Sequence, residues 1–243
     1  MEFLDVAAWH ETLRSVCAVE MEDNVLSDMR IEWDRRSLDL PIHFVHGNFL
    51  EFLLNTDDVY DLYNLDFYGG FLYLAAGGNS RCVDAVRSLI HRHSQRNHSF
   101  VLIATFNVRD TGAKEYSKFI DNVPMALLGW DGIKESCEAH QRSQATRLKL
   151  CFPFLCWQVG MSDGFAVHFD IPTAYSSVTT RSDGKRTTHQ LIHFYAEFVK
   201  QPGALPDLTQ AESLAEIINY PLRRLDGMIP RIELFPQVER PVS

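Results

Sequence analysis

The sequence predicts an α/β protein with a mostly parallel sheet, antiparallel C-terminal strands and helical cover that makes a three-layer sandwich. Strand-like apolar runs alternate with longer helix-like segments through residues 1–120. Long strand-like runs joined by Asp-Gly pairs follow over residues 121–200. The chain has 243 residues, 46% of them hydrophobic, which suffices for one substantial core. We therefore expect a single domain over residues 1–243.

The first predicted strand covers residues 15–19, and a helix over residues 21–37 follows it. Val25, Met29 and Trp33 recur at intervals of four in this helix, so they share one face. The next strand covers residues 42–47, and residues 49–55 form a short helical turn.

The third predicted strand covers residues 59–66 and ends in the stretch Asn-Leu-Asp-Phe-Tyr-Gly-Gly. Residues 80–95 form an amphipathic helix through Val83, Val86 and Ile90. Residues 99–108 form a nearly continuous apolar strand, a pattern typical of a strand covered on both faces.

The second half is predicted to consist of long strands over residues 147–160, 165–178 and 189–200. The turns between them, "MSDG" and "RSDGKRTT", carry Asp-Gly pairs that are typical of hairpins. Residues 201–243 contain several prolines and one helix-like segment at 209–220, which predicts a C-terminal extension packed on the surface.

Composition excludes several classes of protein. The formal charge of −9 argues against a chain-wide basic surface that grips phosphate backbones. Since no apolar run reaches the ~18 residues of a membrane span and the first residues are acidic, a cytoplasmic protein is expected. The five cysteines include no C-x-x-C pair, so neither a disulfide framework nor a zinc site is indicated.

Polar motifs follow the first three predicted strands in turn. Glu20 ends the first strand, Gly47 and Asn48 follow the second, and Asp66 lies at the end of the third. This order resembles the class I S-adenosylmethionine-dependent methyltransferase superfamily, which has a Rossmann-like fold. The resemblance covers about the first 120 residues and rests on order and spacing.

The resemblance implies S-adenosylmethionine as the cofactor. Glu20, with Met21 beside it, would receive the ribose hydroxyls, because a carboxylate accepts two hydrogen bonds from a vicinal diol. Gly47 and Asn48 would lie beside the adenine, where an amide can both accept and donate.

The resemblance also implies a methyl acceptor that carries an amine. Asp66 would accept a hydrogen bond from the amine, and Phe67 or Tyr68 would stack on the substrate ring. The stretch "LDFYGG" is similar to the Asp-Pro-Tyr/Phe-Gly form of members that act on tRNA guanine, with Phe67 in the place of proline. The loop after the fourth strand overlies the substrate in comparable folds, and it contributes the candidates Asn107, Arg109 and Asp110.

One part of the family pattern is missing. A strand and a Gly-rich turn should precede Glu20, whereas residues 1–14 contain no glycine and predict a helix. In the family this strand lies in the middle of the sheet, so its absence would leave two apolar edges unpaired. Three explanations stay open: natural residues precede Met1, another chain or segment fills the gap, or the domain is a degenerate descendant.

Two functions therefore follow as hypotheses. An active chain would transfer a methyl group to an amine, for which an amino group of a nucleobase is the candidate. The alternative is a non-catalytic methyltransferase-like module that binds a protein or nucleic-acid partner through the unpaired edges. A nucleotide-binding hydrolase is disfavoured because the sequence has no G-x-x-x-x-G-K-[ST] loop.

Two groups of histidines are assigned no metal. His91 and His93 fall on different faces of the helix 80–95, and with His98 and the neighbouring arginines they predict a solvated helix end. His189 and His193 lie four apart on a predicted strand, so they share one face and are expected to be exposed neighbours.

Overall fold

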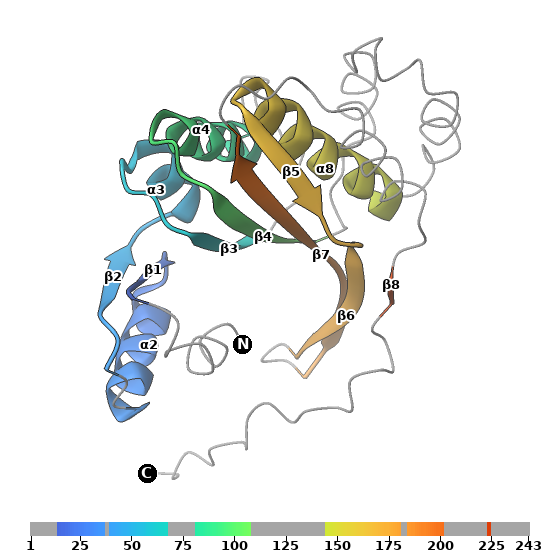
Figure 1. Cartoon of the computed structure of the whole chain (residues 1–243). Coiled ribbons are helices and arrows are strands. Elements are labelled where there is room, and N and C mark those ends of the chain that lie inside the picture. The colour runs from blue at the N-terminus through green and yellow to red at the C-terminus, as the bar shows by residue number, and fades with distance from the viewer. Residues whose placement is uncertain are drawn as a thin grey trace, which may run out of the picture. The chain divides into compact units, whose positions relative to one another are not determined.

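The computed structural model describes two compact units, which divide between Thr56 and Asp57 (Figure 1). Unit 1 contains the described residues before this point, and unit 2 contains those after it. The described residues are 14–36, 39–67, 81–107, 144–180, 184–201 and 223–224.

Unit 1 is a parallel strand pair with two helices. β1 (Val16–Glu20) pairs in parallel with β2 (Ile42–His46), from Val16 opposite Ile42 to Glu20 opposite His46. α2 (Asp23–Arg36) makes the crossover that a parallel pair requires, and it buries Leu26 and Trp33. α3 (Phe49–Asn55) follows β2. The strands and helices predicted over residues 15–55 are thus confirmed in kind and order.

Unit 2 is built on a mixed sheet. β3 (Leu62–Phe67) and β4 (Phe100–Asn107) are parallel neighbours, connected through α4 (Arg81–Gln95). β7 (Arg186–Lys200) runs antiparallel to β4 on the other edge of that strand. β5 (Phe165–Phe169) and β6 (Thr173–Thr180) both run antiparallel to β7, and β8 (Arg223–Arg224) is parallel to β6. The predicted α/β class, with parallel strands first and antiparallel strands after them, is confirmed.

The segment predicted as a strand over residues 147–160 is instead part of a helix, α8 (Gln144–Ser162). Its described side chains are buried around much of the helix, including Phe152, Phe154, Leu155 and both Cys151 and Cys156. A helix that is apolar all round shows no period by which the sequence could distinguish it from a buried strand. The strand prediction was therefore wrong.

α8 and α4 pack on the same face of the unit 2 sheet (Figure 1). The contact is close at Gly160, where an added Cβ would lie 2.4 Å from Val167 Cγ2 and 3.1 Å from Phe198 Cε1. Only a residue without a side chain fits between helix and sheet at this point. These two helices form one helical layer of the predicted sandwich.

The predicted strand 165–178 is divided into β5 and β6. The interruption contains Pro172, which has no N–H to donate to a ladder. The turn "MSDG" does not join two strands, because it connects α8 to β5 with Gly164 at φ +80°. The hairpin predicted at "RSDGKRTT" is confirmed by the antiparallel pairing of β6 with β7, next to Gly184 at φ +77°.

The described strands form two sheets. Among the described residues, β1 pairs with β2 and β3 pairs with β4, and no strand joins the two sheets. The predicted helices at residues 1–14 and 209–220 fall almost wholly outside the described residues, so the structure does not test them.

Candidate functional site

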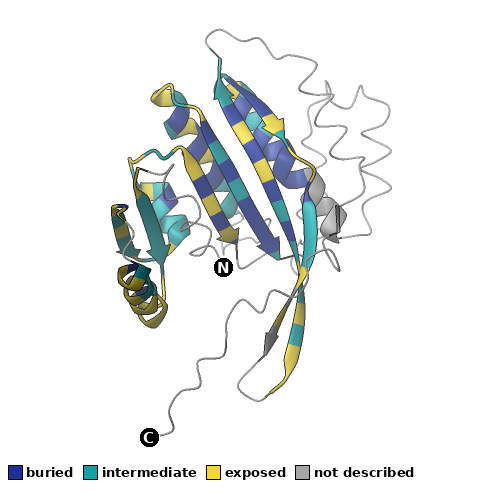
Figure 2. Cartoon of the chain, turned by 60° about the horizontal axis from the view of Figure 1, so that its bottom comes forward, coloured by how far each residue is buried: buried dark blue, intermediate teal, exposed yellow. Residues whose placement is uncertain are grey.

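One face of the unit 2 sheet carries polar side chains between its apolar ones. Figure 2 shows the alternation of buried and exposed residues along the strands. On β3, Tyr63, Leu65 and Phe67 are buried, whereas the intervening Leu62, Asn64 and Asp66 are exposed. Because successive residues of a strand point to opposite faces, this pattern defines a covered face and an open face. α4 and α8 pack on the covered face.

The open face bears a row of polar residues from adjacent strands. Asp66 of β3 is the register partner of Thr105 of β4, and Thr105 is the partner of His193 of β7. His193 is in turn opposite Thr173 of β6. We refer to Asp66, Thr105 and His193 as the polar row. Directly opposite residues in neighbouring strands have their Cβ atoms about 5 Å apart, so these side chains are neighbours.

Hydrogen bonds join β4 to β7 within and beside this row. Thr105 Oγ1 lies 3.0 Å from His193 Nδ1, and Asn107 Nδ2 donates to His189 Nδ1 at 3.3 Å. His189 and His193 therefore share a face, as predicted, and each is held through its Nδ1 atom by a β4 side chain. This contact leaves the Nε2 atom of His193 as the ring nitrogen that a ligand can reach.

The sheet shifts the pKa values of two members of the polar row. Desolvation raises the pKa of the Asp66 carboxyl group, although the nearby His193 acts in the opposite direction. Desolvation also lowers the pKa of His193, and the charge of Asp66 partly counteracts it. The lowered pKa favours the neutral imidazole of His193 at pH 7. The Asp66 carboxylate lies across Thr105 from it and accepts no hydrogen bond from a described residue.

This arrangement suits a ligand that donates N–H groups. A carboxylate accepts hydrogen bonds only, and a neutral imidazole has one nitrogen able to accept a proton. An amine placed against Asp66 would supply the missing donors and would bring its proton close to His193. The row includes Asp66, the residue predicted to bind the acceptor. Asn107, a predicted substrate contact, lies beside the row on the same face.

Unit 1 places the predicted cofactor residues at one edge of its strand pair. Glu20 and His46 end the parallel strands β1 and β2 opposite one another, and Gly47 N donates to Glu20 O at 2.9 Å. Glu20 Oε1 accepts from the N–H groups of Met21 at 2.7 Å and Glu22 at 2.9 Å, so it holds the short segment between β1 and α2. Glu20 Oε2 accepts no hydrogen bond from a described residue.

Asn48 lies at the start of α3. It is the N-cap of that helix, with its Oδ1 accepting from Leu50 N at 2.9 Å, while its Nδ2 remains as a donor. Met21 is 60% exposed, and its carbonyl accepts from His46 Nε2 at 2.9 Å. A Cβ at Gly47 would meet no atom within 4 Å, so nothing described requires glycine there.

Phe67 does not take the role predicted for it. It points to the covered face, where it is 2% exposed and stacked on Phe106 with ring centroids 4.5 Å apart. The alternation of a strand places it on the face opposite to Asp66, so it cannot stack on a ligand held by that carboxylate. Tyr68, Arg109 and Asp110 lie outside the described residues.

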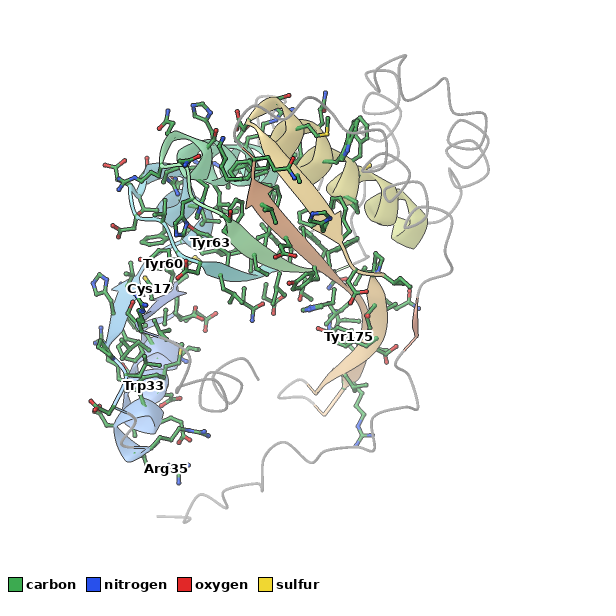
Figure 3. All side chains as sticks on the ribbon, viewed as in Figure 1. Cys17, Trp33, Arg35, Tyr60, Tyr63 and Tyr175 are labelled. Atoms are coloured by element: carbon green, nitrogen blue, oxygen red, sulfur yellow. The ribbon has the colours of Figure 1, made fainter. Side chains whose placement is uncertain are left out.

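The helix end predicted to be solvated contains a buried histidine. His93 is fully buried, and its Nε2 accepts a 2.9 Å hydrogen bond from the Tyr63 hydroxyl, which itself accepts from Tyr60 N. Figure 3 shows Tyr60 and Tyr63 close together, with their rings edge to face at 5.8 Å. His98 continues the chain of contacts, since its Nδ1 lies 3.3 Å from His93 Nδ1 and its Nε2 lies 3.1 Å from Asp61. The prediction was correct for His91, which is exposed, and wrong for His93.

A shallow depression of about 370 Å³ lies between α4 and α8. Because both helices cover the face opposite to the polar row, this depression is separate from the candidate site. It is lined by Arg87, His91, Gln158, Val159, Ser162 and Asp163.

Within the described part of the chain, no three or more His, Cys, Asp or Glu side chains are grouped to hold a metal ion. No helix among the described elements is long and apolar enough to cross a membrane.

The comparisons with known proteins add little. No protein-family model matches the sequence, and no curated protein matches it. A solved structure of precorrin-8w decarboxylase from Methanobacterium thermoautotrophicum is similar over 75% of this chain and 69% of that chain, with 12% sequence identity and a TM-score of 0.32. A similarity at this level carries no argument about function.

Sequence reasoning missed Thr105 and His193 as members of the site. Thr105 is the one hydroxyl within the apolar strand residues 100–106, and His193 was noted only as an exposed neighbour of His189. Their contact depends on the pairing of strands 88 positions apart in sequence, which a single sequence does not reveal.

Proposed function

We propose that the chain is an S-adenosylmethionine-dependent methyltransferase that acts on an amino group of a nucleobase. The observation that carries the proposal is the Asp66 carboxylate on the open sheet face. It lies at the carboxyl end of β3, is partly desolvated, and makes no hydrogen bond to the described residues. A carboxylate to which no described residue donates is suited, in such a position, to binding an N–H-bearing ligand.

The described residues of unit 1 fit part of the cofactor. Glu20 Oε2 can accept from a ribose hydroxyl while Oε1 continues to accept from the N–H groups of Met21 and Glu22. Asn48 Nδ2 can donate to an adenine ring nitrogen while Oδ1 caps α3. S-adenosylmethionine, when bound, supplies an electrophilic methyl group on a sulfonium.

Asp66 would act on the acceptor by orientation. By accepting a hydrogen bond from one N–H of the amino group, it would fix the direction of the nitrogen lone pair. It would also stabilise the positive charge that develops on the nitrogen. A reaction of this kind depends mainly on alignment, so it needs neither a metal nor a strong base.

A transfer assay with tritiated S-adenosylmethionine tests this proposal. Adenosine, cytidine and guanosine serve as acceptors, because each carries an exocyclic amino group. We expect one of them to be labelled by the wild-type protein, and Asp66→Ala to lower the rate at least ~100-fold. The matched control is Asn64→Ala, an exposed position two residues earlier on the same face of β3, which should retain the wild-type rate.

Measuring the affinity of Asp66→Ala for S-adenosylmethionine shows whether a lower transfer rate arises from the acceptor or from cofactor binding. Asp66→Ala should bind S-adenosylmethionine as the wild type does, since the predicted cofactor residues lie on β1, β2 and the turns after them. Loss of both binding and transfer, or of neither, would contradict the role proposed for Asp66.

A second candidate is a non-catalytic module that binds a partner protein. It is favoured by the structural contacts of both side chains, which account for these residues without a cofactor. Glu20 Oε1 accepts from the N–H groups of Met21 and Glu22, and Asn48 Oδ1 caps α3. It is also favoured by the edge strands β1 and β3, each paired on one side only among the described strands. Absence of transfer together with absence of cofactor binding would support this candidate.

A further inference from the structure

The contact between Thr105 and His193 is not explained by strand pairing alone. Thr105 is 4% exposed, and its hydroxyl lies between β3 and β7 on the open face of the sheet. A valine would fill this place in an apolar strand with nearly the same shape. The hydroxyl instead makes a 3.0 Å hydrogen bond to His193 Nδ1, and thereby fixes the orientation of the ring.

We propose that His193 accepts the proton that the amino group releases, and that Thr105 is the positioning residue that directs His193 Nε2 toward Asp66. The proposal rests on the proposed function and names the base for the same site. It requires the tautomer in which His193 Nδ1–H donates to Thr105 Oγ1, so that Nε2 carries the lone pair.

The charges around His193 agree with this role. Asp66 on β3 faces it across Thr105, and His189 and Glu197 lie on the same face of β7 at four residues on either side. On β6 the opposite residue is the uncharged Thr173, and α4 and α8 lie on the other face of the sheet. Desolvation lowers the pKa of His193, so its imidazole is neutral and able to take a proton near pH 7. Asp66 would then stabilise the imidazolium.

The step balances in atoms and charge. The lone pair of the amino nitrogen forms the new N–C bond to the methyl group, and the bond that breaks leaves its electron pair on sulfur. The nitrogen then carries a positive charge and an additional substituent. Its proton moves to His193 Nε2, which leaves a neutral N-methyl amine and an imidazolium that solvent deprotonates.

The first test observes the ring directly. Nitrogen NMR of the wild-type protein with labelled histidine, assigned by comparison with His193→Gln, gives the protonation state and tautomer of His193. We expect a neutral ring at pH 7 with the proton on Nδ1. Thr105→Val should redistribute the tautomers, and Thr105→Ser should restore the wild-type pattern. The proposal would be overturned if the ring is protonated at pH 7, or if Thr105→Val leaves the tautomer unchanged. Either result would count regardless of the methyl-transfer rate.

The second test uses the transfer assay under single-turnover conditions. The wild-type rate should rise with pH through the pKa that NMR assigns to His193. The rate of His193→Gln should lack this inflection and be ~100-fold lower than the wild-type rate at pH 7. The rate of Thr105→Val should decrease less, and Thr105→Ser should restore the wild-type rate. The control is His91→Gln, an exposed histidine of α4 on the covered side, which should keep both rate and inflection.

The two proposals fail in different ways. If wild-type protein labels none of the three nucleosides, the proposed function is wrong and the base assignment fails with it. If labelling occurs and His193→Gln keeps the wild-type rate and pH profile, only the assignment of His193 is wrong.

Discussion

At the scale of residues, His193 and His93 show how position determines chemistry. His193 lies on the open face beside a carboxylate and a hydroxyl, where a neutral ring can exchange protons with a ligand. His93 lies on the covered face between Tyr63, Phe100 and His98, where nothing from solvent reaches it. The first is a candidate for function, and the second contributes to stability.

His93 predicts a pH dependence of stability. Desolvation lowers its pKa from 6.5 to about 4, so the folded state holds the neutral ring while the unfolded state takes up a proton below pH 6.5. The unfolded state therefore binds more protons between pH 6.5 and 4, and stability decreases as the pH falls through this window. A shift of this size corresponds to roughly 3 kcal/mol.

Urea denaturation at a series of pH values measures this effect. His93→Phe should flatten the pH dependence between 6.5 and 4, whereas the exposed His91→Gln should leave it unchanged. An equal slope for wild type and His93→Phe would show that other groups cause the dependence.

The burial of His93 could have been inferred from the sequence. Val86, Leu89 and Ile90 precede it by seven, four and three residues, which are the spacings of one helix face. The prediction of a solvated end gave weight to the neighbouring charges and ignored this periodicity. His98 and Asp61 then complete the contacts of the ring through loop residues that helix periodicity does not include.

At the scale of elements, the strands were easier to predict than the helix α8. β3 alternates between exposed and buried residues along its whole length, so its period of two is visible in the sequence. α8 is apolar on several sides and contains Pro153, and both features hide the helical period. The long apolar run, which exceeds the usual strand length of about 5–6 residues, was the signal that favoured a helix.

The packing of α8 on the sheet predicts the effect of a side chain at Gly160. Gly160→Ala would place a Cβ 2.4 Å from Val167 Cγ2, against two buried neighbours that cannot both move away. We expect a loss of about 1–3 kcal/mol in the free energy of unfolding, although alanine favours a helix more than glycine does. Chemical denaturation measures this change.

Gly47→Ala is the control, because a Cβ at that position meets no atom within 4 Å. A Gly160→Ala protein as stable as wild type would contradict the close contact between α8 and β5.

At the scale of the whole molecule, the sequence predicted the α/β class of the fold and most of its strands, but only part of the candidate site. The α/β class, the parallel strands of the first half and the antiparallel strand β7 follow from apolar runs and turns, whereas the particular pairs β1–β2 and β3–β4 come from the structure. Asp66 was singled out because it ends the third predicted strand, in a stretch similar to a family motif. The polar row as a whole required the register of β4 against β7, which is a long-range property of the folded chain.

The central claim is that this chain binds S-adenosylmethionine through Glu20 and Asn48. Calorimetric titration of the cofactor into the wild-type protein tests it most directly. We predict micromolar binding that Glu20→Gln weakens about tenfold, because the amide keeps an oxygen for the N–H groups of Met21 and Glu22 and loses the charged acceptor for the ribose. Glu22→Gln, the exposed neighbour, should bind as wild type does. No heat at millimolar ligand, or equal affinities for wild type and Glu20→Gln, would contradict the account.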